Sequence, residues 1–344
     1  MSLSVGDCMA LVASVAPLDL AESWDASGLQ VGDRRQPVRR IGVALDATFG
    51  TVSEAVEKDV DFLVVHHPLF FRPLKNLVLD TPLGRVIDTA IRNGLSIYAA
   101  HTNLDSVAGG LNDALASHIG LGDIHVLGQG IRGSDCVLHL KVPVFLQPRV
   151  HEVLAGGGRD ISWWDGMKDE GGSCIARCRI RGNKVSGVQA KIRSLCPDAQ
   201  MDAVPAGERE TGAGLGRMGF LSASMTLSAF SEKVKKDLGL EYVRMVGNPE
   251  TPVRCVALCT GSGGGMMHDA LARGADVLLT GDLKYHEAMD ALDHGLCLVD
   301  AGHFGTERIM VDLMLERLRS VLGEKGEKIS LVPLASQKDP FSVL

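Results

Sequence analysis

The sequence predicts an α/β protein with two similar lobes and a small α+β domain inserted between them. Short runs of β-branched and leucine residues alternate with helical patterns in the first part of the 344-residue chain. The same alternation returns in the last third, in the same order. Such alternation is typical of parallel βα units whose strands are buried on both faces of the sheet. The middle of the chain departs from this pattern, which indicates an insertion.

The two copies place their strands and polar residues at equivalent points. In each copy a helical stretch follows the first strand, at 52–58 and at 266–273, and another helix follows the second strand. Ligands of open α/β sheets gather outside the carboxyl ends of the strands, and polar residues occur at these points in both copies. The predicted strands are 41–45, 60–66 and 94–101 in the first copy, and 256–260, 275–282 and 295–303 in the second.

The central segment predicts a small α+β sandwich. Strand-like runs at 137–144 and 173–180 are each followed by a helical stretch, at 149–154 and 188–195. We therefore expect a first α/β lobe at 1–130, an inserted domain at 131–212, and a second α/β lobe at 213–344 that completes the core.

A long amphipathic helix is expected near the end of the chain, from about Thr306 to Leu322. Its apolar residues recur at spacings of three and four and form one stripe, and Gly323 is expected to end it. The stripe consists of Ile309, Met310, Leu313, Met314, Leu318 and Val321.

Composition excludes several classes of protein. The net charge is −7 and aromatic residues make up 4%, which argues against a nucleic-acid-binding protein. No run approaches the roughly 20 apolar residues that a membrane span needs. The start of the chain lacks a secretory signal, so a cytoplasmic location is expected. The eight cysteines form no Cys-x-x-Cys pair and are expected to be structural thiols.

Two adjacent histidines, His66 and His67, end the apolar run that begins at Asp61. Neighbouring side chains on a strand point to opposite faces, so both can serve one site only where the backbone turns. Pro68 marks that point, because it holds the preceding residue extended. The two imidazoles would then fan apart, each toward one ion of a pair. The alternative is a polar cap on a buried strand.

Three further residues complete a candidate metal site. His303 and Glu307 are four residues apart, which stacks their side chains on one helix face. Glu307 could bridge two ions while His303 holds one. Asp105 follows the strand that ends at Ala100 and offers an oxygen ligand. Mixed imidazole and carboxylate ligands suit zinc, iron or manganese, and we expect two such divalent ions.

Two other histidines are candidates for catalysis by proton transfer, His101 and His286. His101 could instead be a ligand or could support one, and a histidine satisfied within the core is the alternative for both. Lys284 is a possible contact for an anion. The glycine-rich loop at 260–265 lies between a strand and a helix, so it either cradles a phosphate or makes a close turn. No cofactor-binding motif beyond the metal ligands is expected.

Six segments, in chain order, carry a resemblance to a known family. They are Trp24-Asp-Ala-Ser-Gly-Leu-Gln-Val-Gly32, Val65-His-His-Pro-Leu-Phe70, His101-Thr-Asn-Leu-Asp105, Gly214-Leu-Gly-Arg-Met-Gly219, Thr280-Gly-Asp-Leu-Lys-Tyr-His286 and Gly302-His-Phe-Gly-Thr-Glu307. These segments resemble the Nif-three-like dinuclear-metal-centre proteins, often named GTP cyclohydrolase I type two. The resemblance covers nearly the whole chain outside the insert. Ala26 departs from it, since the family usually has asparagine there.

The resemblance implies a two-lobed α/β fold, a hexameric ring and two metal ions per subunit. It implies an inserted domain similar to the PII and CutA folds. It also places the metal ligands on the five residues reached above: His66, His67, Asp105, His303 and Glu307.

Two functions follow as hypotheses. The first is a metal-dependent hydrolase acting on a small, nucleotide-like molecule, with GTP ring opening as the named candidate. The second is a non-catalytic role in metal handling or as a ring-shaped scaffold. A nucleic-acid-binding ring is disfavoured by the acidic balance of the chain.

Overall fold

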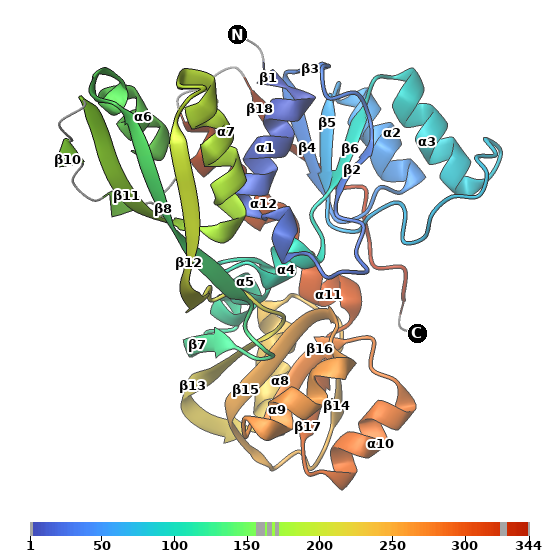
Figure 1. Cartoon of the computed structure of the whole chain (residues 1–344). Helices are drawn as coiled ribbons and strands as arrows, with labels where there is room; N and C mark the ends of the chain where they lie inside the picture. Colours follow the sequence, from blue (N-terminus) through green and yellow to red (C-terminus); the bar gives the residue numbers. More distant parts are fainter. Residues whose placement is uncertain (1–2, 156–161, 164–166, 169–171, 324–328, 343–344) are drawn as a thin grey trace. The chain divides into compact units, whose positions relative to one another are not determined.

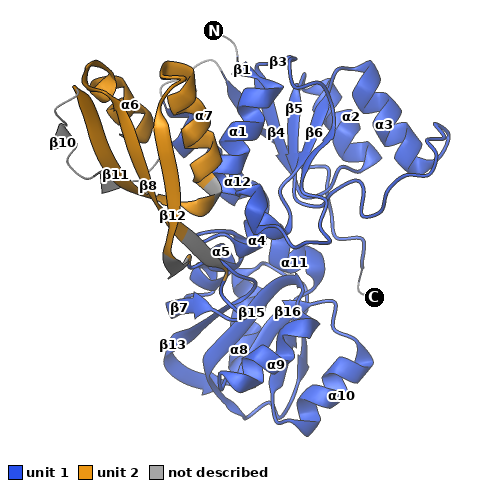
Figure 2. Ribbon diagram, viewed as in Figure 1, with its two compact units in different colours: residues 1–130, 212–344 blue, residues 131–211 orange. Residues whose placement is uncertain are grey.

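The computed structural model describes residues 3–155, 162–163, 167–168, 172–323 and 329–342, and it divides into two compact units (Figure 2). Unit 1 comprises residues 1–130 and 212–344. Unit 2 comprises residues 131–211 and so ends one residue before the expected boundary. Helices and sheets alternate along the chain, which confirms the predicted α/β class. No helix within the described residues is both long and apolar enough to span a membrane.

The first sheet of unit 1 has the strand order β18-β4-β5-β6-β2 (Figure 1). The four strands from β18 to β6 are parallel, and β2 is antiparallel to β6. Every residue of β5 and β6 is buried, as expected for strands covered on both faces. The strands are β2 (Gly28–Val31), β4 (Arg40–Ala44), β5 (Phe62–Val65), β6 (Ser96–Ala99) and β18 (Ser330–Pro333).

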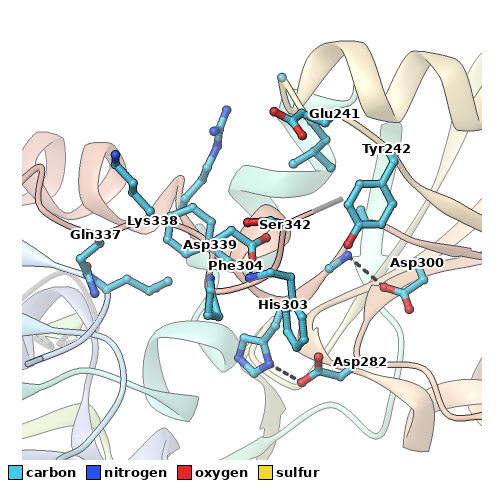
Figure 3. A pocket seen from close by; sticks show the side chains of 18 of the residues that line it. Glu241, Tyr242, Asp282, Asp300, His303, Phe304, Gln337, Lys338, Asp339 and Ser342 are labelled. Carbon is cyan, nitrogen blue, oxygen red and sulfur yellow. Dashed lines mark hydrogen bonds and ion pairs between the residues drawn. The ribbon is translucent and has the colours of Figure 1, made fainter. Parts of the chain in front are cut away.

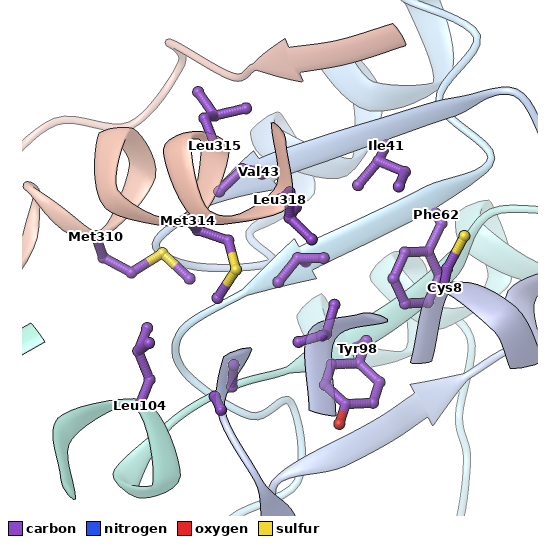
Figure 4. Packing of buried hydrophobic residues seen from close by; sticks show 14 of the residues in the cluster. Cys8, Ile41, Val43, Phe62, Tyr98, Leu104, Met310, Met314, Leu315 and Leu318 are labelled. Atoms are coloured by element: carbon purple, nitrogen blue, oxygen red, sulfur yellow. The ribbon is translucent and has the colours of Figure 1, made fainter. Parts of the chain in front are cut away.

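Helices cover both faces of this sheet. Helices α1 (Val5–Val15) and α12 (Met310–Leu322) pack on one face, in a core that joins Phe62 and Tyr98 to Met314 (Figure 4). Helices α2 (Phe49–Glu57) and α3 (Pro82–Arg92) pack on the other face. Side-chain caps begin three of them: Ser4 with Asp7 for α1, Thr48 for α2 and Thr81 for α3.

The second sheet of unit 1 has the order β14-β17-β16-β15-β13-β7, with β15, β16 and β17 parallel. Helices α5 and α8 share one core with it, and α9 and α10 share another. The elements are α5 (Leu111–His118), β7 (Gly122–Val126), β13 (Arg217–Thr226), α8 (Leu227–Asp237), β14 (Arg244–Val246), β15 (Pro252–Ser262), α9 (Met267–Ala272), β16 (Val277–Gly281), α10 (Tyr285–Asp293) and β17 (Cys297–Asp300).

Unit 1 also contains several short elements. Strands β1 (Leu3–Ser4) and β3 (Pro37–Val38) form a two-stranded sheet. Helix α4 (Thr102–Ser106) follows β6, and 3₁₀ turns span Leu18–Leu20 and Gly264–Met266.

The prediction of one terminal helix from Thr306 to Leu322 is wrong. The structure has α11 (His303–Glu307) and then α12 from Met310, with a turn between them. The Arg308 guanidinium donates a hydrogen bond to the Leu238 carbonyl. The Val311 amide donates to the carbonyl of Arg308, three residues earlier, as in a 3₁₀ turn. Ile309, in the turn between the two helices, keeps right-handed helical backbone dihedrals. The spacing of the apolar residues therefore continues through the turn.

Unit 2 is an antiparallel sheet in the order β10-β11-β8-β12, with β9 also paired to β11. Two helices share an apolar core with one face of it. The similarity to PII and CutA folds stays a prediction. The elements are β8 (Arg132–Pro143), α6 (Gln147–Ala155), β9 (Ser162–Trp163), β10 (Met167–Lys168), β11 (Ser173–Arg181), α7 (Val185–Leu195) and β12 (Gln200–Glu210), with 3₁₀ turns at Val144–Leu146 and Gly182–Lys184.

Arg217, in the Gly214–Gly219 segment, is almost fully buried at the start of β13. Its guanidinium donates two hydrogen bonds to the Asp113 carboxylate, at 2.9 and 2.7 Å. It also donates to the carbonyls of Gly214, Gly216 and Val107. One side chain therefore ties the second sheet to α5 and to the end of α4.

Glu54, on α2, fastens the C-terminal segment to the first sheet. Its carboxylate accepts hydrogen bonds from the amides of Ala335 and Ser336, at 3.1 and 2.9 Å, and from Lys58 at 2.7 Å. Burial alone would raise the pKa of Glu54, but these hydrogen bonds lower it to about 2 from an ordinary 4.5. The carboxylate therefore stabilises the fold only while it is ionised.

Replacing Glu54 with glutamine is expected to remove an acid-sensitive part of the stability. The stabilisation from this group is complete above pH 4.5 and is lost as the pH falls toward 2, because the folded protein must then take up a proton. Urea unfolding measured between pH 2 and 7 should show wild type and variant converging at the acid end. A constant difference across that range would contradict the assignment.

Candidate metal centre

Four histidines are delivered to one place by the carboxyl ends of strands from both sheets of unit 1. His66 and His67 follow β5, His101 lies just beyond β6, and His303 begins α11 shortly after β17. The Leu45 carbonyl accepts the backbone amides of both His66 and His67, at 3.0 and 3.1 Å. The chain therefore turns at the strand end, and the two neighbouring rings lie 5.0 Å apart on the same side.

Each of the four imidazoles is oriented through its Nδ1 atom. An acceptor on Nδ1 fixes the ring and leaves Nε2 available as a ligand, an arrangement usual around metal-binding histidines. The contacts are His66 to the Ala100 carbonyl at 2.8 Å, His67 to Asp46 at 2.8 Å, His101 to Asp25 at 2.9 Å and His303 to Asp282 at 2.7 Å.

Three acceptor atoms face one another at the first part of the site. The Nε2 atoms of His67 and His303 are 3.2 Å apart, and Glu307 Oε2 lies 3.1 Å from each. When both Nδ1 atoms donate to carboxylates, the two Nε2 atoms present lone pairs to each other. The repulsion between these lone pairs is relieved only by a positive charge, either bound protons or a metal cation. Donors about 2.1 Å from a shared ion lie roughly 3.4 Å apart in a tetrahedral site, so these distances fit a metal.

The second part of the site lies around His66, which is completely buried. Its Nε2 atom is 3.7 Å from Asp105 Oδ1 and 3.6 Å from Glu307 Oε1. His101 belongs to the same group, since ligand atoms of His66, His67 and His101 lie within 4.8 Å of one another. The two oxygens of Glu307 thus face different histidines.

Two buried atoms of the site have no hydrogen-bond partner, although buried polar groups are normally satisfied. They are His66 Nε2 and Glu307 Oε2, both among the described residues. The donor set and these unsatisfied atoms together fit the divalent metal that the sequence predicts, and two groups of residues could hold an ion: His66, His67 and His101, and His67, His303 and Glu307.

The charges of these groups depend strongly on one another. Burial lowers the pKa of His67, but the neighbouring carboxylates of Asp46 and Glu307 raise it to about 10 overall. The Glu307 carboxylate, 3.1 Å away, raises the pKa of His303 to about 9. Burial would raise the pKa of Glu307, yet the surrounding imidazoles hold it well below its usual range. Burial, reinforced by Glu307, raises the pKa of Asp105. The cluster therefore attracts positive charge.

The structure does not bring all the predicted residues together. His101, predicted as a proton carrier, lies within the cluster and is placed like a ligand. His286 is exposed on α10, beside the Tyr285 ring, and lies outside both groups. Lys284 is also exposed, with its ammonium group 3.8 Å from Glu287.

Sequence reasoning missed the three aspartates that hold imidazoles, Asp25, Asp46 and Asp282. Asp46 and Asp282 come directly after the end of a strand, or one residue later, which is the position where polar residues gather in such sheets. Asp25 lies in the loop before β2, and its carboxylate also accepts hydrogen bonds from Ser27 and Thr102. Burial would raise the pKa of Asp25, but these contacts and His101 lower it well below its usual range.

A cavity of about 1370 Å³ opens beside His303 (Figure 3). Residues 337–342 of the C-terminal segment form part of its lining, and Tyr242 lies across from the segment. Its lining carries both signs of charge, including Lys284, Arg308 and Lys338 among the cations. A small molecule held there would lie next to His303.

The glycine-rich loop at 260–265 makes a close approach to the cluster. A Cβ atom on Gly261 would lie 2.2 Å from Glu307 Oε1 and 3.2 Å from His303 Nε2, and the Gly261 φ of 63° is in the left-handed region. The absence of a side chain at this position leaves room for the carboxylate.

Replacing Gly261 with alanine is therefore expected to displace Glu307 and weaken metal binding by more than roughly tenfold. Gly265 provides a matched control in the same loop, because a Cβ there would meet nothing within 4 Å. Zinc affinity measured by competition with a chromophoric chelator should fall only for Gly261→Ala. Equal affinities of the two variants would contradict the role assigned to Gly261.

Comparisons with known proteins identify the family of this chain. The family model Duf34/NIF3 (NGG1p interacting factor 3) matches residues 3–340. A protein of Halalkalibacterium halodurans named GTP cyclohydrolase 1 type 2 homolog is 36% identical over 358 residues, covering 96% of each chain. The Bacillus subtilis protein of the same name is 33% identical, covering 96% of this chain and 95% of its own.

A solved structure shows the same fold. The crystal structure of a Bacillus cereus protein related to NIF3 matches with a TM-score of 0.87 and 32% identity, and the match covers 100% of both chains. With the family model matched over nearly its whole length, this chain belongs to the Duf34/NIF3 family.

Proposed function

We propose that this protein holds two divalent metal ions and hydrolyses a small, nucleotide-like substrate. The observation that carries the metal part is the meeting of His67 Nε2, His303 Nε2 and Glu307 Oε2 within 3.2 Å, while carboxylates engage the Nδ1 atoms of both imidazoles. Groups packed in this way need a compensating positive charge, which a divalent ion would supply.

The residues divide between two ion positions. His67, His303 and Glu307 Oε2 would hold one ion. His66, His101, Asp105 and Glu307 Oε1 surround the other position, so Glu307 would bridge the pair. The acceptors on the Nδ1 atoms, three aspartates and the Ala100 carbonyl, would keep each imidazole in the tautomer that offers Nε2. When bound, the ions would supply Lewis acidity toward water and toward a substrate oxygen.

The substrate part rests on two supports. Relatives over 30% identical carry the name GTP cyclohydrolase 1 type 2 homolog. The cavity beside His303 is large enough for a nucleotide, and its lining includes cations that suit phosphate groups: Lys284, Arg308 and Lys338. We therefore combine the relatives' name and the cavity with a metal centre that would activate water, and propose hydrolysis of a nucleotide-like molecule.

The test is metal quantification on protein purified without a chelating tag, followed by turnover assays with GTP and other nucleotides. We expect about two ions per chain, turnover with the native metal, loss of turnover after chelation and recovery on adding the ion back. Bound metal without turnover on any nucleotide would overturn the hydrolase and favour a role in metal handling. The hexameric ring implied by the family resemblance stays a prediction, which a mass measurement in solution can check.

A further inference from the structure

The C-terminal segment sends one side chain toward the metal centre. Gln337 is half-buried, whereas Ala335, Ser336 and Lys338 around it are exposed. Upstream, strand β18 pairs in parallel with β4, and the Leu334 amide donates to the Val43 carbonyl at 3.0 Å. The segment therefore reaches Gln337 from a fixed position at the end of β4.

The side-chain amide of Gln337 makes two hydrogen bonds, one as an acceptor and one as a donor. Its Oε1 atom accepts from the Leu45 backbone amide. Its Nε2 atom donates to Asp46 Oδ2 at 3.0 Å. An amide supplies both a donor and an acceptor, so glutamine satisfies both neighbours at once.

Both of these neighbours act directly on the histidines. The Leu45 carbonyl accepts the amides of His66 and His67. The other oxygen of Asp46, Oδ1, lies 2.8 Å from His67 Nδ1. The chain of contacts thus runs from Gln337 through Asp46 to His67, whose Nε2 atom faces Glu307.

Asp46 has little else to hold it in place. Its side chain is 40% exposed, and within the described residues its carboxylate has hydrogen bonds only to His67 and Gln337. Without Gln337, the carboxylate could rotate toward solvent and release the His67 ring. Groups that orient a ligand in this way commonly change metal affinity by roughly 10- to 100-fold.

We propose that Gln337 is a positioning residue for the metal centre, acting through Asp46 on His67. This inference rests on the proposed metal centre and adds to it a contribution from the end of the chain. The C-terminal segment, beyond lining the cavity, sets the orientation of a ligand.

The experiment compares metal affinity with folding in the same variants. Cobalt or zinc affinity is measured by chelator competition for wild type, Gln337→Ala and Gln337→Glu, with Gln200→Ala, at an exposed glutamine of unit 2, as control. Gln337→Glu keeps the length and the acceptor but loses the donor and repels Asp46. We expect both Gln337 variants to bind roughly tenfold more weakly, with Gln200→Ala unchanged. Thermal unfolding of the metal-free proteins should differ little.

A double-mutant cycle tests the route through Asp46. In an Asp46→Ala background, adding Gln337→Ala should cause no further loss of affinity, because the group it positions is gone. If the affinity losses of the two single variants simply multiply in the double variant, Gln337 does not act through Asp46. Unchanged affinity in the single Gln337 variants, or weaker binding explained wholly by unfolding, would overturn the proposal. A wild-type protein that binds no divalent ion would instead overturn the metal centre itself.

Discussion

Replacing Glu307 with alanine is expected to abolish binding at both ion positions. Its two oxygens face different parts of the site, His66 on one side and the pair His67 and His303 on the other. Loss of a group that merely orients a ligand costs roughly 10- to 100-fold in affinity, so loss of a shared ligand should exceed 100-fold. Turnover should disappear with the metal.

Glu307→Gln separates charge from shape, because it keeps one oxygen acceptor but removes the negative charge. We expect it to bind metal far more weakly than wild type. Glu316→Gln, on the exposed side of α12, makes the same chemical change away from the site and should leave metal content unchanged. Metal content per chain, measured by elemental analysis, checks all three variants. Two ions retained by Glu307→Ala would contradict the bridging role.

Replacing Arg217 with alanine is expected to cause the largest loss of stability. The guanidinium is almost fully buried and donates to Asp113 and to three carbonyls. Removing it leaves the Asp113 carboxylate without its counter-ion, with the Gly109 amide still donating to it. Breaking a buried ion pair from one side typically costs about 3–5 kcal/mol in the free energy of unfolding.

Urea unfolding of the metal-free protein, followed by circular dichroism, measures this loss. Arg254→Ala is the matched control, because it removes the same charge from an exposed position on the adjacent strand β15. Its effect should stay within roughly 0.5 kcal/mol. Metal affinity should also fall in Arg217→Ala, since Arg217 holds the end of α4 beside Asp105. A loss of stability no greater than that of the control would contradict the structural role.

Periodicity predicted much of the fold because the parallel strands are short apolar runs bounded by glycine or polar residues. The runs at 41–45 and 60–66 correspond to β4 and β5, and 275–282 to β16. The break between α11 and α12 carries no such signal, because helical spacing of apolar residues continues through it. Antiparallel β13 also escaped prediction, because it buries Arg217 and exposes Phe220, which breaks the expected alternation of apolar and polar residues.

The candidate ligands could be identified because His66-His67 and His303-x-x-x-Glu307 are dense local patterns. The groups that orient them could not. Asp46 and Gln337 are 291 residues apart in the chain and meet only after folding. A single glutamine in an exposed terminal segment has no periodicity, and a lone aspartate after a strand resembles an ordinary turn residue. His286 lies outside the cluster, because its nearness in sequence to the Thr280–Asp282 segment does not bring it there, and its catalytic role stays a prediction.

The distance along the chain between His67 and His303, 236 residues, has a consequence for biosynthesis. An N-terminal portion emerging from the ribosome can form the first strands of its sheet early, yet it lacks His303 and Glu307. The remaining donors, and the strand that completes the edge of that sheet, are translated last. Chains that stop before His303 therefore lack both of these donors, so the proposed centre can be completed only after Glu307 has been translated.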